Sequence, residues 1–355
     1  MNTNKVQNVQ DLFRNFSQEI GKVVVGNQNA KRRVFGALLT NQHLVFTSVP
    51  GLAKTTLISA VQAVIEGAVS AVINFVPDML PNALIGSRVF DQQHREYRIE
   101  HGKLFGSHIV LADEINRSPQ TTQAALLGAM QERRISIDGQ VFELNTPFMV
   151  FATQNPVEQE GTYPLPEAQI DRFLFNPVLT YNTPAEQAQI VRLQSKHGTN
   201  LLKSIKLAPV CSITDIVRLT QEIQDNVRVP EQAIAYAVNL VRATRPNDPL
   251  CQEHLKEHTA DIALPASQRA PGNLIIAAKV EAAIAARDHV SLDDIKAVAP
   301  DVLRHRIGLM PAAVRRVNTD SIIAKLLERV PTGTAEYAPD EAVPFVPEWA
   351  RHRLI

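Results

Sequence analysis

The sequence predicts an α/β fold in which a parallel five-stranded sheet carries two inserted β-hairpins and is followed by a small all-α domain. Short apolar runs alternate with helical segments up to about residue 180, which is typical of a covered parallel sheet. Strand signals nearly vanish after that point. Capping-box signatures begin instead at Thr183, Ser212 and Ser291, each with an acidic residue three positions later, and indicate helix starts.

The expected strands are short and almost entirely apolar, as strands buried on both faces are, and they cover residues 43–47, 72–75, 108–112, 148–153 and 173–179. The expected hairpins cover residues 87–100 and 135–142, the second with Asp-Gly at its turn. After the third strand, Ser118 is expected to cap a helix whose first turn contains Pro119.

These patterns divide the chain into three parts. Residues 1–180 are expected to form the α/β core with an N-terminal helix, and residues 181–330 the helical domain. Residues 331–355 are a proline-rich tail that is too short to fold alone. At 355 residues the chain is long enough for two domains with separate cores.

The composition argues against several classes of protein. The 36 basic and 36 acidic residues cancel, which argues against a broad nucleic-acid-binding surface. No apolar stretch reaches the roughly 18 residues that a membrane span requires, and the N-terminus lacks the apolar segment of a signal peptide. The two cysteines, Cys211 and Cys251, provide neither a disulfide framework nor a metal quartet. We therefore expect a cytoplasmic protein.

A phosphate-binding loop is predicted directly after the first strand, where Ser48 to Thr56 read SVPGLAKTT. In the pattern G-x-x-x-x-G-K-[ST], backbone N–H groups and a helix N-terminus surround a phosphate. Here only the Lys-Thr end is intact, because Ser48 and Ala53 replace the two glycines. The residues expected to hold the nucleotide in this loop are Pro50, Gly51, Leu52, Ala53, Lys54, Thr55 and Thr56.

Polar residues end the next buried strands. Asp113 and Glu114 follow one apolar run, and buried acids need a cation, so Asp113 is expected to hold Mg²⁺ with Thr55 and Glu114 to activate water. Asn155 follows another run and could contact the γ-phosphate and the water; an ordinary Asn-Pro turn is the alternative. Arg172 is either a surface charge or an arginine finger that acts on a neighbouring subunit.

Taken in this order, the motifs resemble the MoxR-type AAA+ ATPases over about residues 15–330. The matching segments are VVG at 24–26, VPGLAKT at 49–55, ADEINR at 112–117, AMQER at 129–133, ATQNP at 152–156, LPEAQIDRF at 165–173 and VLRHR at 302–306. The resemblance implies a P-loop AAA+ core with a helical lid, ATP and Mg²⁺ as ligands, and a ring that is most often hexameric.

The resemblance also implies individual roles. Lys54 and Thr55 match Walker A, Asp113 and Glu114 match Walker B, and Asn155 matches sensor 1. Arg172 matches the arginine finger, and Arg269 matches the sensor 2 arginine of the lid. Val24, Val25 and Gly26 match the segment that lies against adenine. Ser48 and Pro271-Gly272 depart from the family pattern.

The function implied is ATP hydrolysis that drives chaperone-like remodelling or maturation of client proteins, often with a partner that carries a von Willebrand factor A domain. A nucleotide-dependent binding switch with little turnover is one alternative, and a nucleic-acid remodeller is another. A third is a zinc protease, because His254 to His258 match His-x-x-Glu-His.

Overall fold

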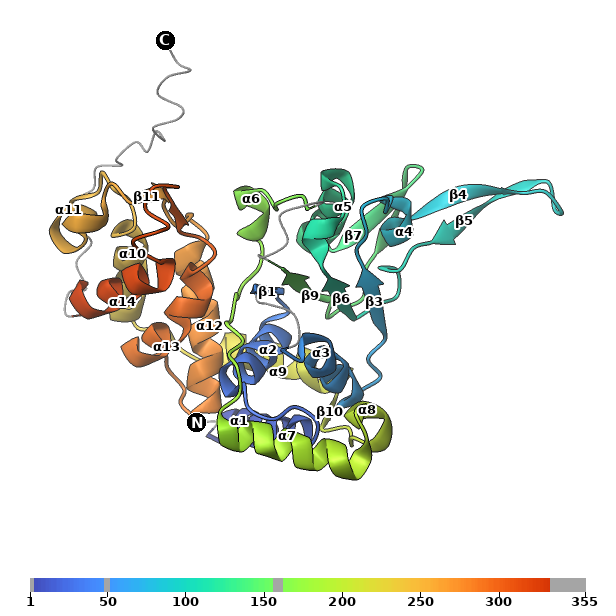
Figure 1. Ribbon diagram of the computed structural model, residues 1–355, viewed down its shortest axis with the longest axis horizontal. Helices are drawn as coiled ribbons and strands as arrows, with labels where there is room; N and C mark the ends of the chain where they lie inside the picture. The colour runs from blue at the N-terminus through green and yellow to red at the C-terminus, as the bar shows by residue number, and fades with distance from the viewer. Residues whose placement is uncertain (1–2, 48–51, 156–161, 333–355) are drawn as a thin grey trace, which may run out of the picture. The chain divides into compact units, whose positions relative to one another are not determined.

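The computed structural model describes residues 3–47, 52–155 and 162–332, which form two compact units (Figure 1). The first unit comprises residues 8–221, and the second comprises residues 222–355 together with residues 1–7. The boundary falls later than the expected one at residue 180. In the first unit, Val210 N donates to Val64 O, and β10 (Cys211–Ser212) pairs with β2 (Ile65–Glu66), so the chain beyond 180 returns to the α/β core.

A parallel sheet forms the centre of the first unit. Its four strands, among the described residues, run in the spatial order β1 (Leu44–Thr47), β9 (Met149–Gln154), β6 (Ile109–Asp113) and β3 (Ser70–Asn74). All three strand pairs are parallel. The carboxyl ends of β1, β6 and β9 therefore meet at one edge, where ligands bind in open α/β sheets.

The fifth predicted strand is present only as a short edge pairing. Leu44 forms an isolated parallel bridge with Phe175, and Val45 N donates to Phe175 O. The expected range of 173–179 was too long because Pro177 has no N–H to donate to a strand ladder.

Helices cover both faces of the sheet. Figure 1 shows α5 (Gln120–Glu132) on one side and α2 (Gln28–Thr40) and α3 (Lys54–Ala63) on the other. Leu126, Leu127 and Met130 of α5 are buried in the core with sheet residues, as their helical spacing predicts. Ser118 does not cap α5 as expected, because its hydroxyl donates to Ile115 O.

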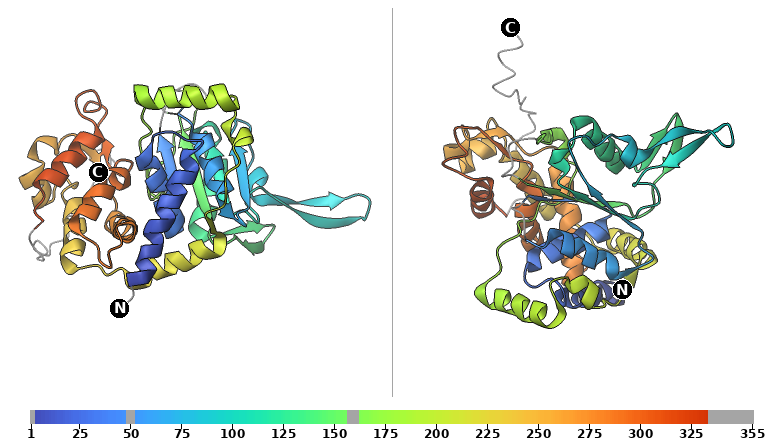
Figure 2. Two further views of the ribbon diagram at one scale, coloured as in Figure 1. Left: turned by 90° about the horizontal axis from the view of Figure 1, so that it is seen from below. Right: turned by 45° about the vertical axis from the view of Figure 1, so that its right-hand side comes forward.

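Both expected hairpins are confirmed. The first comprises β4 (Gly86–Asp91) and β5 (Glu96–His101), and the second comprises β7 (Arg134–Ile137) and β8 (Gln140–Glu143). Figure 2 shows β4 and β5 projecting away from the sheet of their unit. The remaining elements of the first unit are α4 (Asn82–Ile85), η1 (Ile115–Arg117), α6 (Glu167–Ile170), α7 (Pro184–His197) and α8 (Leu201–Ser204). Helix α1 (Thr3–Gly21) also belongs to this unit from residue 8 onward, and its first residues are assigned to the second unit.

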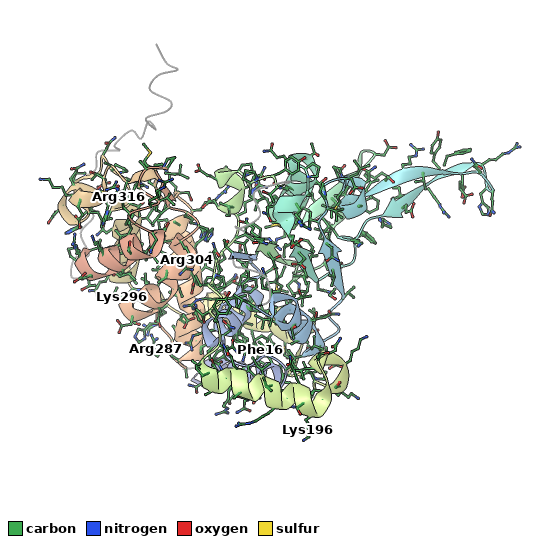
Figure 3. All side chains as sticks on the ribbon, in the orientation of Figure 1. Phe16, Lys196, Arg287, Lys296, Arg304 and Arg316 are labelled. Atoms are coloured by element: carbon green, nitrogen blue, oxygen red, sulfur yellow. The ribbon has the colours of Figure 1, made fainter. Side chains whose placement is uncertain are left out.

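The second unit is mainly helical. Its elements are α10 (Glu231–Arg242), α11 (Pro249–His254), η2 (Lys256–His258), β11 (Ile262–Leu264), α12 (Ala270–Ile284), α13 (Leu292–Leu303), β12 (Gly308–Leu309) and α14 (Thr319–Arg329). Helix α9 (Ile213–Asn226) crosses the boundary between the units. Arg304, labelled in Figure 3, donates to Asp301 and Asp320 and so ties α13 to α14.

The expected capping boxes are confirmed in three places. Thr183 and Glu186 exchange hydrogen bonds at the start of α7, as do Ser291 and Asp294 at the start of α13. Ser212 and Asp215 make the same reciprocal pair at α9. Within the described ranges, no helix has both the length and the apolar character needed to span a bilayer.

Candidate nucleotide site

The lysine of the predicted phosphate-binding loop opens helix α3. Lys54 is the first residue of α3, and Ala53 before it has a left-handed backbone with φ of 57°. The N-terminus of a helix presents backbone N–H groups and partial positive charge, so this position suits a phosphate. Pro50 and Gly51, with Ser48 and Val49, lie outside the described residues.

The two predicted acids end the central strand β6. Asp113 Oδ1 accepts a hydrogen bond of 2.6 Å from Thr153 Oγ1. Glu114 has a left-handed backbone with φ of 56°, and its carboxylate lies 3.1 Å from Arg117 Nη1. The left-handed turn is unusual for a residue with a side chain and marks a position that its surroundings hold in place.

Electrostatic coupling joins the lysine to both acids. Burial lowers the pKa of the Lys54 amine, while the negative charges of Asp113 and Glu114 act to raise it. Lys54 opens the helix that follows β1, and the two acids end β6, so all three residues lie where the carboxyl ends of the parallel strands meet. The fold therefore brings one cation and two acids together at the carboxyl edge of the sheet.

Asn155 lies at the same edge, directly after β9, and is buried. Asn116 holds its backbone from both sides: Asn116 Nδ2 donates to Asn155 O at 3.2 Å, and Asn155 N lies 3.5 Å from Asn116 Oδ1. The predicted sensor position is therefore connected to the chain segment that follows the two acids.

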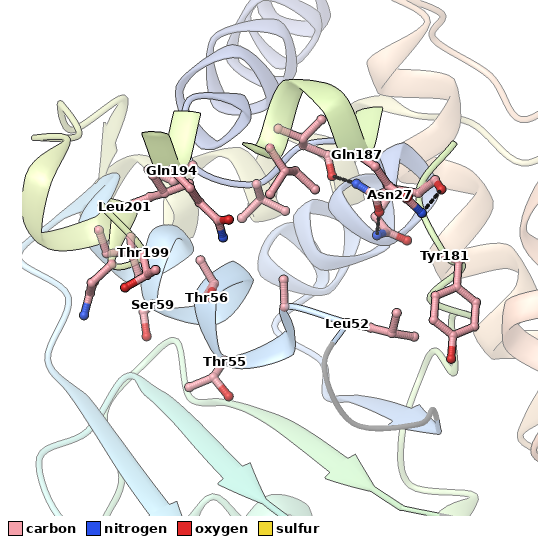
Figure 4. Close-up of a pocket in the computed structure, with 18 residues that line it drawn as sticks. Asn27, Leu52, Thr55, Thr56, Ser59, Tyr181, Gln187, Gln194, Thr199 and Leu201 are labelled. Carbon is pink, nitrogen blue, oxygen red and sulfur yellow. Dashed lines mark hydrogen bonds between the residues drawn. The ribbon is translucent and has the colours of Figure 1, made fainter. Parts of the chain in front are cut away.

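A cavity of about 660 Å³ opens beside the start of α3 (Figure 4). It is within the size range of small-molecule sites. Its lining comes from the loop after α1, from the start of α3 and from residues 181–202, and includes Val23, Val24, Val25, Asn27, Leu52, Ala53, Thr55, Thr56, Tyr181, Asn182, Gln187, Gln194 and Asn200. Figure 4 shows the Gln194 side chain of α7 pointing into this cavity. Most residues predicted for the nucleotide thus lie along one hollow.

Polar contacts hold the α7 segment against the loop after α1. Asn182 Nδ2 donates to Val25 O at 3.0 Å, and Thr180 N donates to Asn27 Oδ1 at 3.2 Å. Lys31 of α2 is only 1% exposed; burial lowers its pKa and the Glu186 carboxylate acts to raise it. Glu186 also exchanges hydrogen bonds with Thr183 in the capping box that anchors the start of α7.

Gly26, in the loop after α1, lies beside the Glu186 carboxylate. Its φ is 71°, and a Cβ added there would be 2.9 Å from Glu186 Oε1. Only glycine fits that backbone and that spacing without displacement.

The residues predicted to hold Mg²⁺ offer the ligands that this ion prefers. Thr55 carries a hydroxyl and Asp113 a carboxylate, and Mg²⁺ usually binds one or two such oxygens together with phosphates and water. Within the described residues no group of three or more His, Cys, Asp or Glu side chains could hold an ion alone. The donor set therefore fits a magnesium ion that arrives with a phosphate ligand.

The two predicted arginines are placed differently. Arg172 is half-buried, and its Nη1 donates to Leu127 O at 2.6 Å. Arg269 belongs to the second unit and forms the N-cap of α12, with Pro271 and Gly272 in the first turn of that helix. The catalytic roles of both arginines stay predictions.

The zinc-protease interpretation of residues 254–258 is wrong. Helix α11 ends at His254, so the two histidines do not lie on one helical face. His258 contacts Asp261 and Lys325 through its two ring nitrogens, and Glu257 pairs with Lys325 and Arg329. A charged network therefore occupies His258 and Glu257, two of the three side chains that zinc chemistry would need.

Sequence reasoning missed the residues that connect the site. Thr153 and Asn116 lay within recognised motifs but received no role, and no pattern along the chain shows that they bridge two strands. The cavity residues on and before α7 were also missed. Their only signal was the capping box at Thr183, which predicts a helix but not what the helix covers.

The chain is similar to known proteins over most of its length. Residues 43–175 match the family described as "ATPase family associated with various cellular activities (AAA)", and residues 256–326 match the AAA lid domain. The chain is 38% identical to "Chaperone MoxR1" of Mycobacterium tuberculosis, over 88% of this chain and 80% of that protein. It is 30% identical to "Protein MoxR" of Methylorubrum extorquens, over 90% of this chain and 95% of that protein.

A solved structure is similar as well. A crystal structure described as a candidate ATPase from Cytophaga hutchinsonii aligns with a TM-score of 0.81 and 37% identity, over 92% of this chain and 96% of that one. The expected AAA+ fold, with a central parallel sheet and a helical lid domain, is thereby confirmed. The chain belongs to the MoxR family of AAA+ ATPases.

Proposed function

We propose that this chain hydrolyses MgATP and uses the change of nucleotide state to remodel or mature client proteins. The observation that carries the proposal is that Lys54, Asp113 and Glu114 share the carboxyl edge of the sheet, and that the residues on either side of Lys54, Ala53 and Thr55, line the cavity. A cation and two carboxylates at the carboxyl edge of a parallel sheet suit a metal-bound triphosphate. Adenine and ribose occupy the cavity, against Val24, Val25 and Gly26.

Each side chain has a separate task in the reaction. Lys54 neutralises β- and γ-phosphate oxygens, Glu114 takes a proton from the attacking water, and Asn155 orients that water. Thr55 and Asp113 would hold Mg²⁺, which, when bound, neutralises charge on the phosphates. The Arg117 guanidinium, 3.1 Å from Glu114, must leave room for the water.

Arg172 acts on the nucleotide of a neighbouring subunit in a ring, which we propose to be a hexamer. An arginine supplied from another chain contributes about 10³- to 10⁵-fold in rate, so an isolated subunit turns over slowly. In this chain Arg172 Nη1 donates to Leu127 O. When the guanidinium reaches a phosphate, it either gives up this hydrogen bond or keeps it and binds the phosphate through its other N–H groups. Arg269 contributes from the lid as sensor 2.

The two hairpins face the client. Phe90 and Tyr97 are 51% and 62% exposed on β4 and β5, and their rings pack edge to face at 5.1 Å. Arg88 lies over the Tyr97 ring and pairs with Asp138 of the second hairpin at 2.7 Å. Exposed aromatic side chains on a supported ribbon offer contact area to an unfolded or extended segment. The ATPase works in the cytoplasm with a partner bearing a von Willebrand factor A domain.

The decisive test compares wild type with Glu114→Gln. The variant should bind ATP with wild-type affinity and lose nearly all turnover, because only the base is removed. Equal losses of binding and hydrolysis would contradict the role of Glu114. If wild type binds ATP without measurable turnover, the chain is a nucleotide-dependent binding switch instead.

Oligomerisation is tested by measuring turnover against protein concentration. Specific activity should rise as subunits assemble, and Arg172→Ala should abolish that rise. A flat specific activity down to monomeric concentrations would contradict the ring. Glu114→Gln, held in its ATP state, is then the bait for isolating clients and a von Willebrand factor A partner.

A further inference from the structure

One buried hydroxyl contacts both acids of the candidate site. Thr153 is fully buried at the carboxyl end of β9. Its Oγ1 donates to Asp113 Oδ1 at 2.6 Å and accepts from Glu114 N at 2.8 Å. A threonine hydroxyl has one proton to donate and lone pairs to accept with, so both capacities are used here.

The parallel register explains why Thr153 reaches these two groups. Ala112 of β6 pairs with Ala152 of β9, so Asp113 and Thr153 are the next residues on neighbouring strands. At that level β6 turns away through the left-handed backbone of Glu114. The Glu114 N–H therefore needs an acceptor outside the strand ladder, and Thr153 provides it.

We propose that Thr153 is the residue that positions the Asp113 carboxylate for the metal and the Glu114 backbone for catalysis, an inference that rests on the proposed ATPase function. Thr153 need not touch the nucleotide. It fixes one oxygen of Asp113 and therefore the rotation of the carboxylate. It also stabilises the turn from which the Glu114 side chain projects.

A purely structural role is the competing explanation. Thr153 is itself fully buried in β9, where a β-branched side chain packs well whatever its polarity. The two explanations predict opposite rankings for two substitutions. Thr153→Val keeps the branched shape and removes the hydroxyl, whereas Thr153→Ser keeps the hydroxyl and removes the methyl group. If packing is what matters, serine is the harmful change; if positioning matters, valine is.

The first readout is nucleotide binding by calorimetry, with and without Mg²⁺. In Thr153→Val, ADP affinity in EDTA should stay within about twofold of wild type, while the gain in ATP affinity on adding Mg²⁺ should shrink about tenfold. The second readout is turnover. We expect kcat of Thr153→Val to fall about 10- to 100-fold, as for a misplaced catalytic group, with a higher Mg²⁺ concentration needed for half-maximal rate. In Thr153→Ser, both the Mg²⁺-dependent gain in ATP affinity and kcat should lie within about threefold of wild type.

Thr40→Val is the matched control, because the buried Thr40 hydroxyl donates only within α2, to Gly36 O and Ala37 O, far along the chain from the acids. It should change neither the Mg²⁺ dependence nor kcat. A Thr153→Val protein with the wild-type Mg²⁺ response overturns the inference and leaves the ATPase proposal intact. A wild-type protein that binds no adenine nucleotide overturns both. A wild-type protein that binds ATP without hydrolysing it contradicts only the proposed hydrolysis, because the effect of Mg²⁺ on ATP affinity still tests the role of Thr153.

Discussion

Asn116 holds the backbone of Asn155 on both sides, through its amide donor to Asn155 O and its amide oxygen facing Asn155 N. Asn116, two residues after Glu114, therefore sets the position of the predicted sensor at the end of the neighbouring strand. Both residues are buried, so the backbone groups of Asn155 have little access to water if Asn116 is lost.

Asn116→Ala should lower stability and turnover together. Leaving a buried donor or acceptor unpaired costs about 1–3 kcal/mol, and a shift of about 1 Å in Asn155 can cost about 100-fold in rate. Urea unfolding and steady-state ATPase assays measure the two effects. Asn116→Asp keeps an acceptor for Asn155 N and loses the donor to Asn155 O, so it should be intermediate. A fully active Asn116→Ala protein would show that Asn155 needs no such support.

Lys54→Met should weaken nucleotide binding itself. Charge-assisted hydrogen bonds contribute about 1.5–3 kcal/mol, so ATP affinity should fall about 10- to 100-fold. Calorimetry with ATP and ADP measures this loss, which should be larger for ATP because of the γ-phosphate. Lys196→Met, an exposed lysine at the end of α7, removes the same charge from the same unit and should bind normally. Similar losses in the two variants would indicate a non-specific charge effect.

The sequence predicted the sheet and the charged centre because both follow from local pattern. The apolar runs at 43–47, 108–112 and 148–153 match β1, β6 and β9 within about one residue, and the polar residues at their ends necessarily share one edge of a parallel sheet. The fifth strand is shorter than its apolar run suggests because Pro177 has no N–H to donate to a strand ladder.

The features that the sequence patterns did not predict depend on contacts between residues far apart in the chain. The Thr153 hydroxyl meets Asp113 only through the register of β6 and β9, which no spacing along the chain encodes. The extent of the first compact unit depends in the same way on pairing between β2 and β10. Local signals such as the Thr183 capping box located the start of α7 but not the cavity that it lines.

Gly26→Ala should weaken both the fold and nucleotide binding. A residue with a Cβ in the left-handed region costs about 1–2 kcal/mol. The added methyl group would also push against Glu186, which anchors α7 beside the cavity. Chemical unfolding and ADP calorimetry measure the two losses.

Gly106→Ala separates backbone strain from the contact with Glu186. Gly106 has φ of 72°, almost that of Gly26, but a Cβ there meets nothing within 4 Å. Gly106→Ala should lower the free energy of unfolding by about 1–2 kcal/mol, as backbone strain does at Gly26, and should bind ADP with wild-type affinity. Equal nucleotide affinity in the two variants would refute a role for the Gly26–Glu186 contact in shaping the cavity.

His43 should make stability depend on pH. It is buried directly before β1, with Nδ1 accepting from Val150 N at 3.0 Å and Nε2 lying 3.3 Å from Met130 O. Both contacts suit the neutral ring with its proton on Nε2, and a second proton on Nδ1 would face the Val150 N–H. Burial, with a smaller effect from the Arg133 charge, lowers the pKa of His43 to about 3.

The sign of the effect follows from proton binding. In the unfolded chain His43 titrates near its ordinary pKa of about 6.5, so below that pH the unfolded state binds a proton that the folded state does not. The contribution of His43 is therefore complete above pH 6.5 and is lost as the pH falls towards 3. At pH 5 it should lower the free energy of unfolding by about 2 kcal/mol relative to pH 8. Urea unfolding at both pH values measures the change. His43→Gln removes the titrating group. The drop in its free energy of unfolding between pH 8 and pH 5 should therefore be about 2 kcal/mol smaller than in wild type, whatever its overall stability. An unchanged difference between the two pH values in His43→Gln would show that other groups cause the acid sensitivity.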